Sequence, residues 1–262
     1  MAAMPPDDQE ETIDAILGGR LRIIQKKKGY RFSIDALLLA HFVELREESN
    51  LLDLGTGSGI IALILGSRNP RCQVLGIDVQ EEIAAMAGRS VALNGLTERV
   101  AIRQGDARCP GTFCQPRHFD AVVCNPPYRR LASGRMNPHP GKALARHEIA
   151  GTVGDFLAAA AFALKDGGRV TTIYPATRLV ELLMRMRSVR LEPKRMQIVH
   201  SRPGGNGEFV LLEGVKGGRE ALRVLPPLCI YGEGRGYGPE MAAIFQSLAA
   251  FPADAGDRSP WS

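Results

Sequence analysis

The sequence has no uninterrupted apolar run of the length, about 18 residues, that a membrane-spanning helix needs. Its five cysteines form no C-x-x-C pair, so they indicate neither a zinc site nor a disulfide framework, and we expect reduced thiols. The first 12 residues carry four acidic side chains and no lysine or arginine, unlike a signal peptide. These absences favour a cytoplasmic protein without a membrane partner or a metal.

Length and composition are those of a globular protein. The chain has 262 residues, of which 45% are hydrophobic and 23% are charged, enough for one sizeable core. We expect one domain over residues 13–248, after a disordered acidic segment, 1–12, and before a flexible tail, 249–262. Residues 13–262 hold 33 basic and 24 acidic side chains, a net charge of +9 that suits a polyanionic partner.

A short motif after a buried strand carries the clearest chemistry. The apolar run 119–124 predicts a strand, which Asn125-Pro126-Pro127-Tyr128 must end because proline has no N–H to donate. In an open α/β sheet, ligands bind at this carboxyl end. The Asn125 side-chain oxygen and the Pro126 carbonyl can accept the two hydrogens of a planar amino group, and Tyr128 offers a face for stacking. The structural alternative is a Pro-Pro strand terminator with a buried Asn and a packed Tyr.

A strand, a glycine loop and a helix follow one another at residues 51–65. The loop Gly55-Thr56-Gly57-Ser58-Gly59 lets the backbone approach a ligand and leaves free N–H groups at the start of the helix. Its G-x-G-x-G spacing is not that of a dinucleotide pyrophosphate loop, and the charge of Asp53 before it would repel a pyrophosphate. The pattern fits a cofactor with a cationic amino-acid end.

Two further acids follow the next two strands. Asp78 ends the strand 73–77, where a carboxylate accepts hydrogen bonds from both hydroxyls of a ribose. Asp106 follows the strand at 100–104, where it is placed to receive a purine amino group. With Asp53, these acids predict a pocket for a nucleoside joined to an amino acid, although each alone is more often a helix cap or a turn residue.

These segments resemble the class I S-adenosylmethionine-dependent methyltransferases, in the branch that methylates planar amino nitrogens. The resemblance implies a Rossmann-like α/β fold with a doubly wound, mostly parallel seven-stranded sheet. A final antiparallel strand pair is expected at 196–199 and 208–215. The resemblance also implies S-adenosyl-L-methionine as cofactor, bound by Phe32, Asp35, Asp53, Gly55, Thr56, Gly57, Gly59, Asp78, Val79, Asp106, Ala107 and Asn125, with Asn125, Pro126, Pro127 and Tyr128 as the catalytic residues.

The ends of the chain carry a second resemblance, to the bacterial tRNA(Val) adenine-N6-methyltransferase family. The segments that carry it are Tyr30 to Ala40, Ala145-Arg146-His147-Glu148, Glu208 to Lys216 and Pro226 to Tyr231. The resemblance implies methylation of the exocyclic amine of an unpaired adenine next to a tRNA anticodon. It also implies that the segment from Phe32 to Asp35 covers the methionine end of the cofactor.

Basic residues mark the surface expected to contact tRNA or another structured RNA. An alternating run at 21–32 predicts a hairpin with a triple lysine at its turn, and a helix at 33–45 follows, so that residues 13–48 form a lid. A basic loop at 129–148 follows the Asn125 motif. The alternatives are a solvated hairpin tip and a surface loop. The residues expected to contact phosphates are Lys26, Lys27, Lys28, Arg129, Arg130, Arg135 and Arg146.

The motif at Asn125 does not select the substrate, because adenine, cytosine, guanine and a glutamine side chain all carry a planar amino group. Flipping a base out of a duplex costs a few kcal/mol, whereas stacking on one aromatic ring returns about 1–3 kcal/mol, so an unpaired base is the cheaper target. A protein glutamine methyltransferase, an rRNA guanine amino methyltransferase and a non-catalytic RNA-binding module that holds the cofactor stay open as alternatives.

Overall fold

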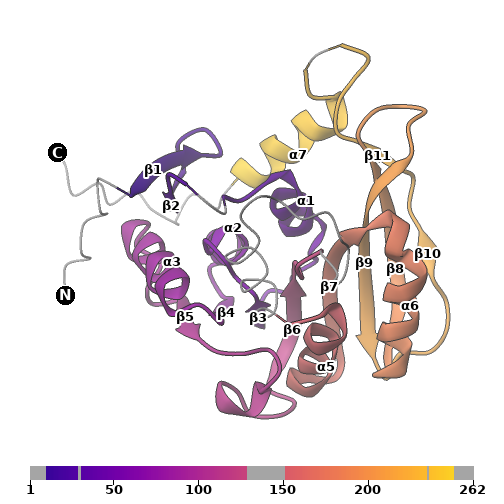
Figure 1. Ribbon diagram of the computed structural model, residues 1–262, viewed down its shortest axis with the longest axis horizontal. Helices are drawn as coiled ribbons and strands as arrows, with labels where there is room; N and C mark the ends of the chain where they lie inside the picture. The colour runs from indigo at the N-terminus through magenta and orange to yellow at the C-terminus, as the bar shows by residue number, and fades with distance from the viewer. Residues whose placement is uncertain (1–9, 29–30, 129–150, 235, 251–262) are drawn as a thin grey trace, which may run out of the picture.

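A single mixed sheet forms the centre of the computed structural model, which describes residues 10–28, 31–128, 151–234 and 236–250 (Figure 1). The strands of this sheet are β3 (Asn50–Leu54), β4 (Gln73–Asp78), β5 (Val100–Gln104), β6 (Phe119–Cys124), β7 (Leu164–Pro175), β8 (Leu191–His200), β9 (Gly207–Lys216), β10 (Arg223–Val224) and β11 (Leu228–Cys229). They run in the order β10-β8-β9-β7-β6-β3-β4-β5, and β11 pairs with β8.

The sheet has the topology that the sequence predicts. Strands β7, β6, β3, β4 and β5 are parallel neighbours, and β9 lies antiparallel between β7 and β8. This confirms the doubly wound, mostly parallel arrangement with a final antiparallel pair. The two-residue strands β10 and β11 add to the expected seven. The carboxyl ends of β3, β4, β5 and β6 meet at one edge of the sheet.

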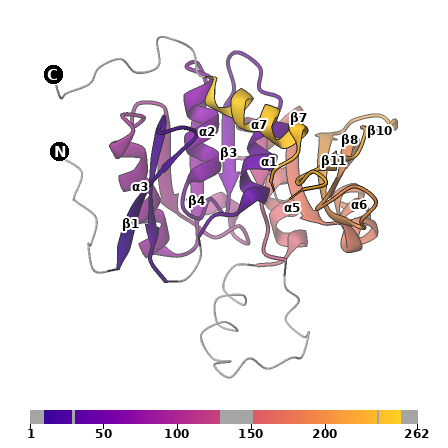
Figure 2. The same ribbon diagram turned by 90° about the horizontal axis from the view of Figure 1, so that it is seen from above.

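Helices cover both faces of the sheet (Figure 2). They are α1 (Ile34–Phe42), α2 (Ile60–Arg68), α3 (Glu81–Leu93), α5 (Val153–Ala163), α6 (Leu179–Ser188) and α7 (Pro239–Ala249). One core cluster joins α1, α2 and α7 to the sheet, and a second joins α5 and α6. Adjacent residues of β3 enter different clusters, Leu51 the first and Leu52 the second, because successive side chains of a strand point to opposite faces.

The N-terminal hairpin differs from the predicted one. Strand β1 (Glu11–Ile16) pairs with β2 (Leu21–Lys26), and the turn lies at residues 17–20, where Leu17 and two glycines have positive φ. The triple lysine therefore begins at the end of β2 and does not form the turn. Residues 11 and 12, expected to be disordered, belong to β1, because Glu11 forms a bidentate ion pair with Arg89 of α3.

Helix α1 is shorter than the predicted helix at 33–45, because Val43 is extended and ends it. Its Asp35 lies in the first turn and is buried. Among the described residues, no helix combines the length and the apolar character that crossing a bilayer requires. In the same ranges, no three or more His, Cys, Asp or Glu side chains gather as metal ligands do.

Candidate active site

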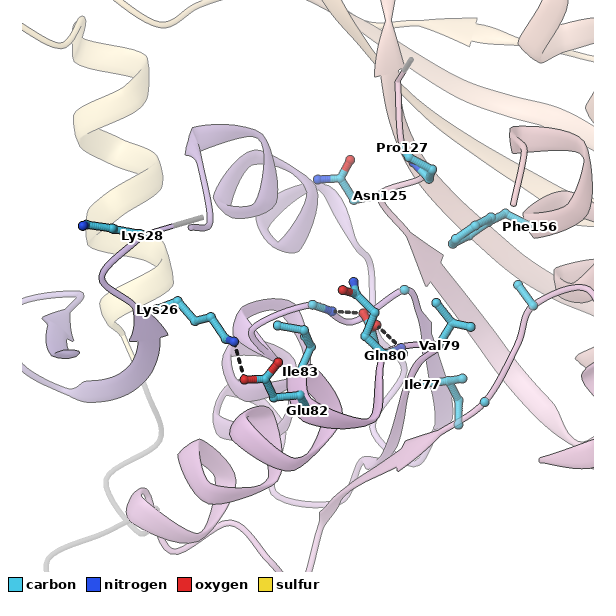
Figure 3. Close-up of a pocket in the computed structure, with 15 residues that line it drawn as sticks. Lys26, Lys28, Ile77, Val79, Gln80, Glu82, Ile83, Asn125, Pro127 and Phe156 are labelled. Atoms are coloured by element: carbon cyan, nitrogen blue, oxygen red, sulfur yellow. Dashed lines mark hydrogen bonds and ion pairs between the residues drawn. The ribbon is translucent and has the colours of Figure 1, made fainter. Parts of the chain in front are cut away.

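A pocket opens at the carboxyl ends of the parallel strands, where the sequence predicts ligand binding (Figure 3). Of the residues expected to bind a cofactor, six line it: Gly55, Gly57, Asp78, Val79, Ala107 and Asn125. The pocket therefore brings together only some of the glycines and acids that the sequence predicts there. The remaining residues of that set do not line it.

The glycine loop forms one wall of the pocket and is tied to the end of β4. The backbone N–H groups of Gly55 and Thr56 both donate to the Ile77 carbonyl, over 2.8 and 2.9 Å. Gly55 has a φ of 72°, and a Cβ built on it would lie 2.8 Å from the ring of Phe156. Only glycine fits there, so the backbone itself faces the pocket. Gly59 caps α2 and does not line the pocket.

Asp78 is held in place at the carboxyl end of β4. Its Oδ2 accepts the Gly57 N–H over 3.0 Å, and its Oδ1 accepts the Gln80 N–H over 3.0 Å. Burial raises the pKa of this carboxyl, although the two backbone bonds partly oppose the rise. Each carboxylate oxygen has a second lone pair, so Asp78 retains acceptors for the hydroxyls of a ribose.

Asp53 lies beneath the glycine loop and does not face the pocket. Its side chain is fully buried, and Oδ2 accepts the Thr56 hydroxyl over 2.6 Å. Burial raises the pKa of Asp53 to about 7. The expected direct contact with the cationic end of a cofactor stays a prediction. Asp53 and Thr56 shape the loop from behind, because residue 53 of β3 points into the interior.

Asp106 pairs with Arg108 in this structure. Both of its carboxylate oxygens accept from the Arg108 side chain, with a closest distance of 2.6 Å, and the Arg108 backbone N–H donates to it over 2.8 Å. Arg108 accordingly lowers the pKa of Asp106. The neighbours Gly105 and Ala107 line the pocket, but Asp106 itself does not. A guanidinium two residues along the chain occupies the acceptors that a purine amino group would need.

The hairpin lysines lie over the pocket. Lys26 and Lys28 line it, and the Lys26 ammonium forms an ion pair with Glu82 at the start of α3 (Figure 3). Both lysines lie on the pocket wall, and their expected role on RNA phosphates stays a prediction. Lys27 does not line the pocket. The other residues expected to contact phosphates lie outside the described residues: Arg129, Arg130, Arg135 and Arg146.

Three side chains from two distant segments meet at the end of β6. Asp35 Oδ2 accepts from Asn125 Nδ2 over 3.1 Å and from the Tyr128 hydroxyl over 2.6 Å. The Tyr128 hydroxyl also lies 2.7 Å from Asn125 Oδ1. Because a carboxylate only accepts hydrogen bonds, the amide nitrogen of Asn125 must face Asp35, and its oxygen lies beside the Tyr128 hydroxyl. Asn125 lines the pocket, whereas Asp35 does not.

The ring of Tyr128 packs away from the pocket. It meets Tyr174 edge-on, with ring centroids 5.9 Å apart, and Phe209 at 5.8 Å. The Tyr128 carbonyl accepts from Arg178 over 2.8 Å. Tyr128 does not line the pocket, and its predicted stacking against a substrate base stays a prediction. Pro127 lines the pocket beside Asn125, and Pro126 is buried.

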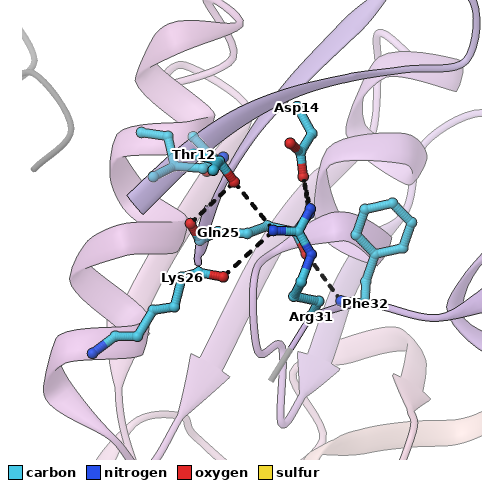
Figure 4. A network of polar contacts seen from close by, with 8 residues as sticks. Thr12, Asp14, Gln25, Lys26, Arg31 and Phe32 are labelled. Atoms are coloured by element: carbon cyan, nitrogen blue, oxygen red, sulfur yellow. Dashed lines mark hydrogen bonds and ion pairs between the residues drawn. The ribbon is translucent and has the colours of Figure 1, made fainter. Parts of the chain in front are cut away.

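The segment before α1 contacts the hairpin more than the pocket. Phe32 packs against the first core cluster and donates its N–H to Gln25 Oε1 over 3.0 Å (Figure 4). Neither Phe32 nor Asp35 lines the pocket, and their expected contact with a cofactor stays a prediction.

The pocket also includes residues that the sequence did not single out. Phe156 reaches it from α5, and Ile77, Gln80 and Ile83 reach it from the end of β4 and the start of α3. Phe156 lies about 100 positions from the glycine loop, and its apolar helix carries no motif. Ile77, Gln80 and Ile83 lie close to Asp78 in the sequence. Their closeness to that acid is the sequence feature that could have identified them as pocket residues.

Comparisons with known proteins agree on the family and the fold. A family model described as the methyltransferase small domain matches residues 33–188. A tRNA1(Val) (adenine(37)-N6)-methyltransferase from Porphyromonas gingivalis is 30% identical over 164 residues, 62% of this chain and 64% of the relative, so the match spans less than two thirds of that relative's length. A protein of the same name from Aeromonas hydrophila is 30% identical over 68% of this chain and 73% of the relative.

A solved structure supports the fold alone. A predicted O-methyltransferase, protein Atu636 from Agrobacterium tumefaciens, matches with a TM-score of 0.68 and 23% identity, over 83% of this chain and 98% of that chain.

Proposed function

The chain belongs to the methyltransferase small domain family, and we propose that it transfers a methyl group from S-adenosylmethionine to the exocyclic amine of an unpaired adenine in tRNA, next to the anticodon. The observation that carries this proposal is the position of Asn125. Its amide lies at the end of β6, on the wall of the pocket that also holds the glycine loop and Asp78. A methyl donor and the amine that receives the methyl group can therefore meet at this wall of the pocket.

The pocket residues fit S-adenosylmethionine as cofactor. The Asp78 carboxylate, fixed by two backbone N–H groups, accepts the ribose hydroxyls. Gly55 and Gly57 allow close approach of the backbone, and the apolar side chains of Ile77 and Phe156 suit the nucleoside's planar base. When bound, the cofactor supplies an electrophilic methyl group.

Asn125 and Pro126 prepare the amine for attack. An exocyclic amine is a poor nucleophile, because its lone pair is delocalised into the ring. When the Asn125 oxygen and the Pro126 carbonyl accept its two hydrogens, the lone pair is directed toward the methyl group, and such positioning supplies roughly 7–11 kcal/mol of the barrier in favourable cases. Attack by the nitrogen would form the N–C bond while the S–C bond of the cofactor breaks and S-adenosylhomocysteine leaves. The methylated nitrogen would then be acidic and would release its proton to water, so no dedicated base would be required.

The choice of tRNA rests on the named relatives and on charge. Two relatives, from Porphyromonas gingivalis and Aeromonas hydrophila, are each 30% identical to this chain over the matched residues. Both carry the name tRNA1(Val) (adenine(37)-N6)-methyltransferase. The net charge of +9 over residues 13–262 suits a polyanion. An unpaired base next to an anticodon needs no flipping from a duplex, which removes a cost of a few kcal/mol.

A labelling experiment tests this function. The purified protein is incubated with methyl-labelled S-adenosylmethionine and, in parallel, with unmodified tRNA transcripts or with ribosomal and release-factor proteins. We expect label in tRNA, recovered as N6-methyladenosine after digestion to nucleosides. Label on a glutamine side chain would replace the tRNA proposal with protein methylation. RNA binding without any label transfer would contradict the enzymatic proposal.

A further inference from the structure

We propose that Asp35 is a positioning residue for the amine-binding group. Resting on the proposed amine methylation, the inference is that Asp35 fixes the orientation of the Asn125 amide and takes the hydrogen bond of the Tyr128 hydroxyl. Asn125 Oδ1 is then free to accept a hydrogen of the substrate amine. This role differs from the cofactor contact that the sequence led us to expect for Asp35.

The carboxylate of Asp35 is surrounded by donors. Only 5% of the residue is exposed, and its Oδ1 accepts from the Ala36 N–H over 3.0 Å and from the Ser33 hydroxyl. Its Oδ2 accepts from Asn125 and Tyr128. An amide that must donate to this carboxylate cannot rotate by 180° without bringing two acceptors together. Asp35 thereby selects one of the two orientations of Asn125.

The Tyr128 hydroxyl has one proton and two acceptors within reach, Asp35 Oδ2 at 2.6 Å and Asn125 Oδ1 at 2.7 Å. A hydroxyl donates fully to only one of them at a time. The charged carboxylate is the stronger acceptor, so the proton goes to Asp35. Asn125 Oδ1 then faces the lone pairs of the phenol oxygen, and no other donor to it is found in the part of the chain that the structure describes. An incoming amine N–H supplies that donor, and the site is organised for it before the substrate binds.

The N-terminal hairpin holds Asp35 in place. Gln25 of β2 is 2% exposed, and its Oε1 accepts the Phe32 N–H while its Nε2 donates to Asp14 of β1 over 2.6 Å (Figure 4). Arg31 forms an ion pair with the same Asp14. These contacts fasten the segment that leads into α1, so the hairpin sets where Asp35 meets the end of β6.

The first test separates positioning from cofactor binding. For Asp35→Asn, we expect kcat for amine methylation to fall by about 10-fold or more, while the Kd of S-adenosylmethionine, measured by calorimetry, stays within about 3-fold of the wild-type value. The intact cofactor affinity also reports that the variant is folded. A large rise in Kd with an unchanged kcat at saturation would overturn the proposal in favour of a cofactor contact.

The second test exchanges the two side chains. In Asn125→Asp alone, a carboxylate oxygen replaces the amide nitrogen that lies 3.1 Å from Asp35. Two acceptors then face each other, and we expect activity to be lost. Adding Asp35→Asn restores a donor opposite a carboxylate. We expect the double variant to be at least about 10-fold more active than Asn125→Asp. A double variant no better than the single one would overturn the proposal.

A matched control is Asp120→Asn, at the opposite end of β6, where the carboxylate pairs with Lys165 and accepts the Asn50 N–H. We expect its kcat to stay within about 2-fold of wild type. All variants are assayed on whichever macromolecule the wild-type protein labels. A protein substrate would refute the tRNA proposal and still test Asp35, whereas a wild-type protein that labels nothing would overturn both proposals.

Discussion

Hydrogen bonds at the cofactor end of the pocket join residues close in the sequence, whereas at the Asn125 end they join distant segments. Thr56 and Asp53 are 3 positions apart, and Gly57 and Asp78 are 21 apart. By contrast, Asp35 is 90 positions from Asn125 and 93 from Tyr128. One end of the pocket is thus built within a single strand-loop-helix-strand unit, and the other is assembled only when α1 packs beside β6.

This difference separates two kinds of function. Under the proposed function, backbone groups of the glycine loop and one fixed carboxylate would bind the cofactor, so changes there should alter its affinity. Side chains from two segments would orient the amine, so changes there should alter the rate of methyl transfer. The expected effects below test whether the two ends act independently, and they run from the largest to the smallest.

Asn125→Ala is expected to have the largest effect. It removes the oxygen that accepts an amine hydrogen, so kcat should fall by at least about 100-fold, as it does when a reacting group loses its alignment. The Kd of S-adenosylmethionine should stay within about 3-fold of wild type, measured by calorimetry on the same preparation. If cofactor affinity falls together with kcat, the two ends of the pocket are not independent.

Asp78→Ala should affect the other end. It removes a charged acceptor for the ribose hydroxyls and leaves the Gly57 and Gln80 N–H groups without their acceptor. Hydrogen bonds to charged groups are worth about 1.5–3 kcal/mol, so the cofactor Kd should rise roughly 10-fold to 150-fold. At saturating cofactor, kcat should remain within about 3-fold of wild type. A Kd that does not change would show that Asp78 does not contact the cofactor.

Gly55→Ala tests the backbone wall at the same end. The new methyl group would meet the Phe156 ring at 2.8 Å, in a residue whose φ of 72° is already unfavourable for alanine. We expect the cofactor Kd to rise about 5-fold to 10-fold. Gly95→Ala is the matched control, because its φ is 66° and a Cβ there meets no atom within 4 Å. Equal losses of affinity in both variants would assign the effect to backbone strain alone.

Asp53→Asn should give the smallest effect on methyl transfer, and its main consequence should be a pH-dependent change in stability. Burial raises the pKa of Asp53 from 3.8 to about 7, so between those pH values the folded protein retains a proton that the unfolded chain releases. The wild-type free energy of unfolding therefore falls as pH rises through that range and stays lower above it. Asn removes this titration and still accepts from Thr56.

The gain in stability from Asp53→Asn should accordingly be larger at pH 8 than at pH 4, by on the order of 1–4 kcal/mol. Urea unfolding at the two pH values measures it. A gain that is the same at both would show that Asp53 is not protonated preferentially in the folded state.

The contrast between contacts within one short unit and contacts between distant segments also explains how much of this structure the sequence predicts. The sheet, the glycine loop and the pocket position of Asp78 follow from local patterns, because strand periodicity and positive-φ glycines act within a short stretch. The partners of Asp53 and Asp106 could not be predicted, because the sequence does not show that Thr56 and Arg108 donate to these carboxylates, and the expected cofactor roles of both acids stay predictions. Only the tertiary fold reveals that Asp35 contacts Asn125.

The hairpin shows a related limit. The alternating run beginning at Leu21 correctly marks one strand, but its partner is the earlier strand β1, whose first two residues fall in the acidic segment 1–12 that was expected to be disordered. An ion pair between Glu11 and Arg89, 78 positions away, stabilises that strand. Composition alone does not contain that information.

The most direct test of the central claim is mass spectrometry of nucleosides from an unmodified tRNA transcript incubated with S-adenosylmethionine and either the wild-type protein or Asn125→Ala. We predict N6-methyladenosine from an unpaired adenine next to the anticodon with the wild-type protein, and a loss of at least about 100-fold with the variant. The claim is contradicted if the wild-type protein produces no methylated adenosine, or if Asn125→Ala produces it at a rate close to that of the wild type.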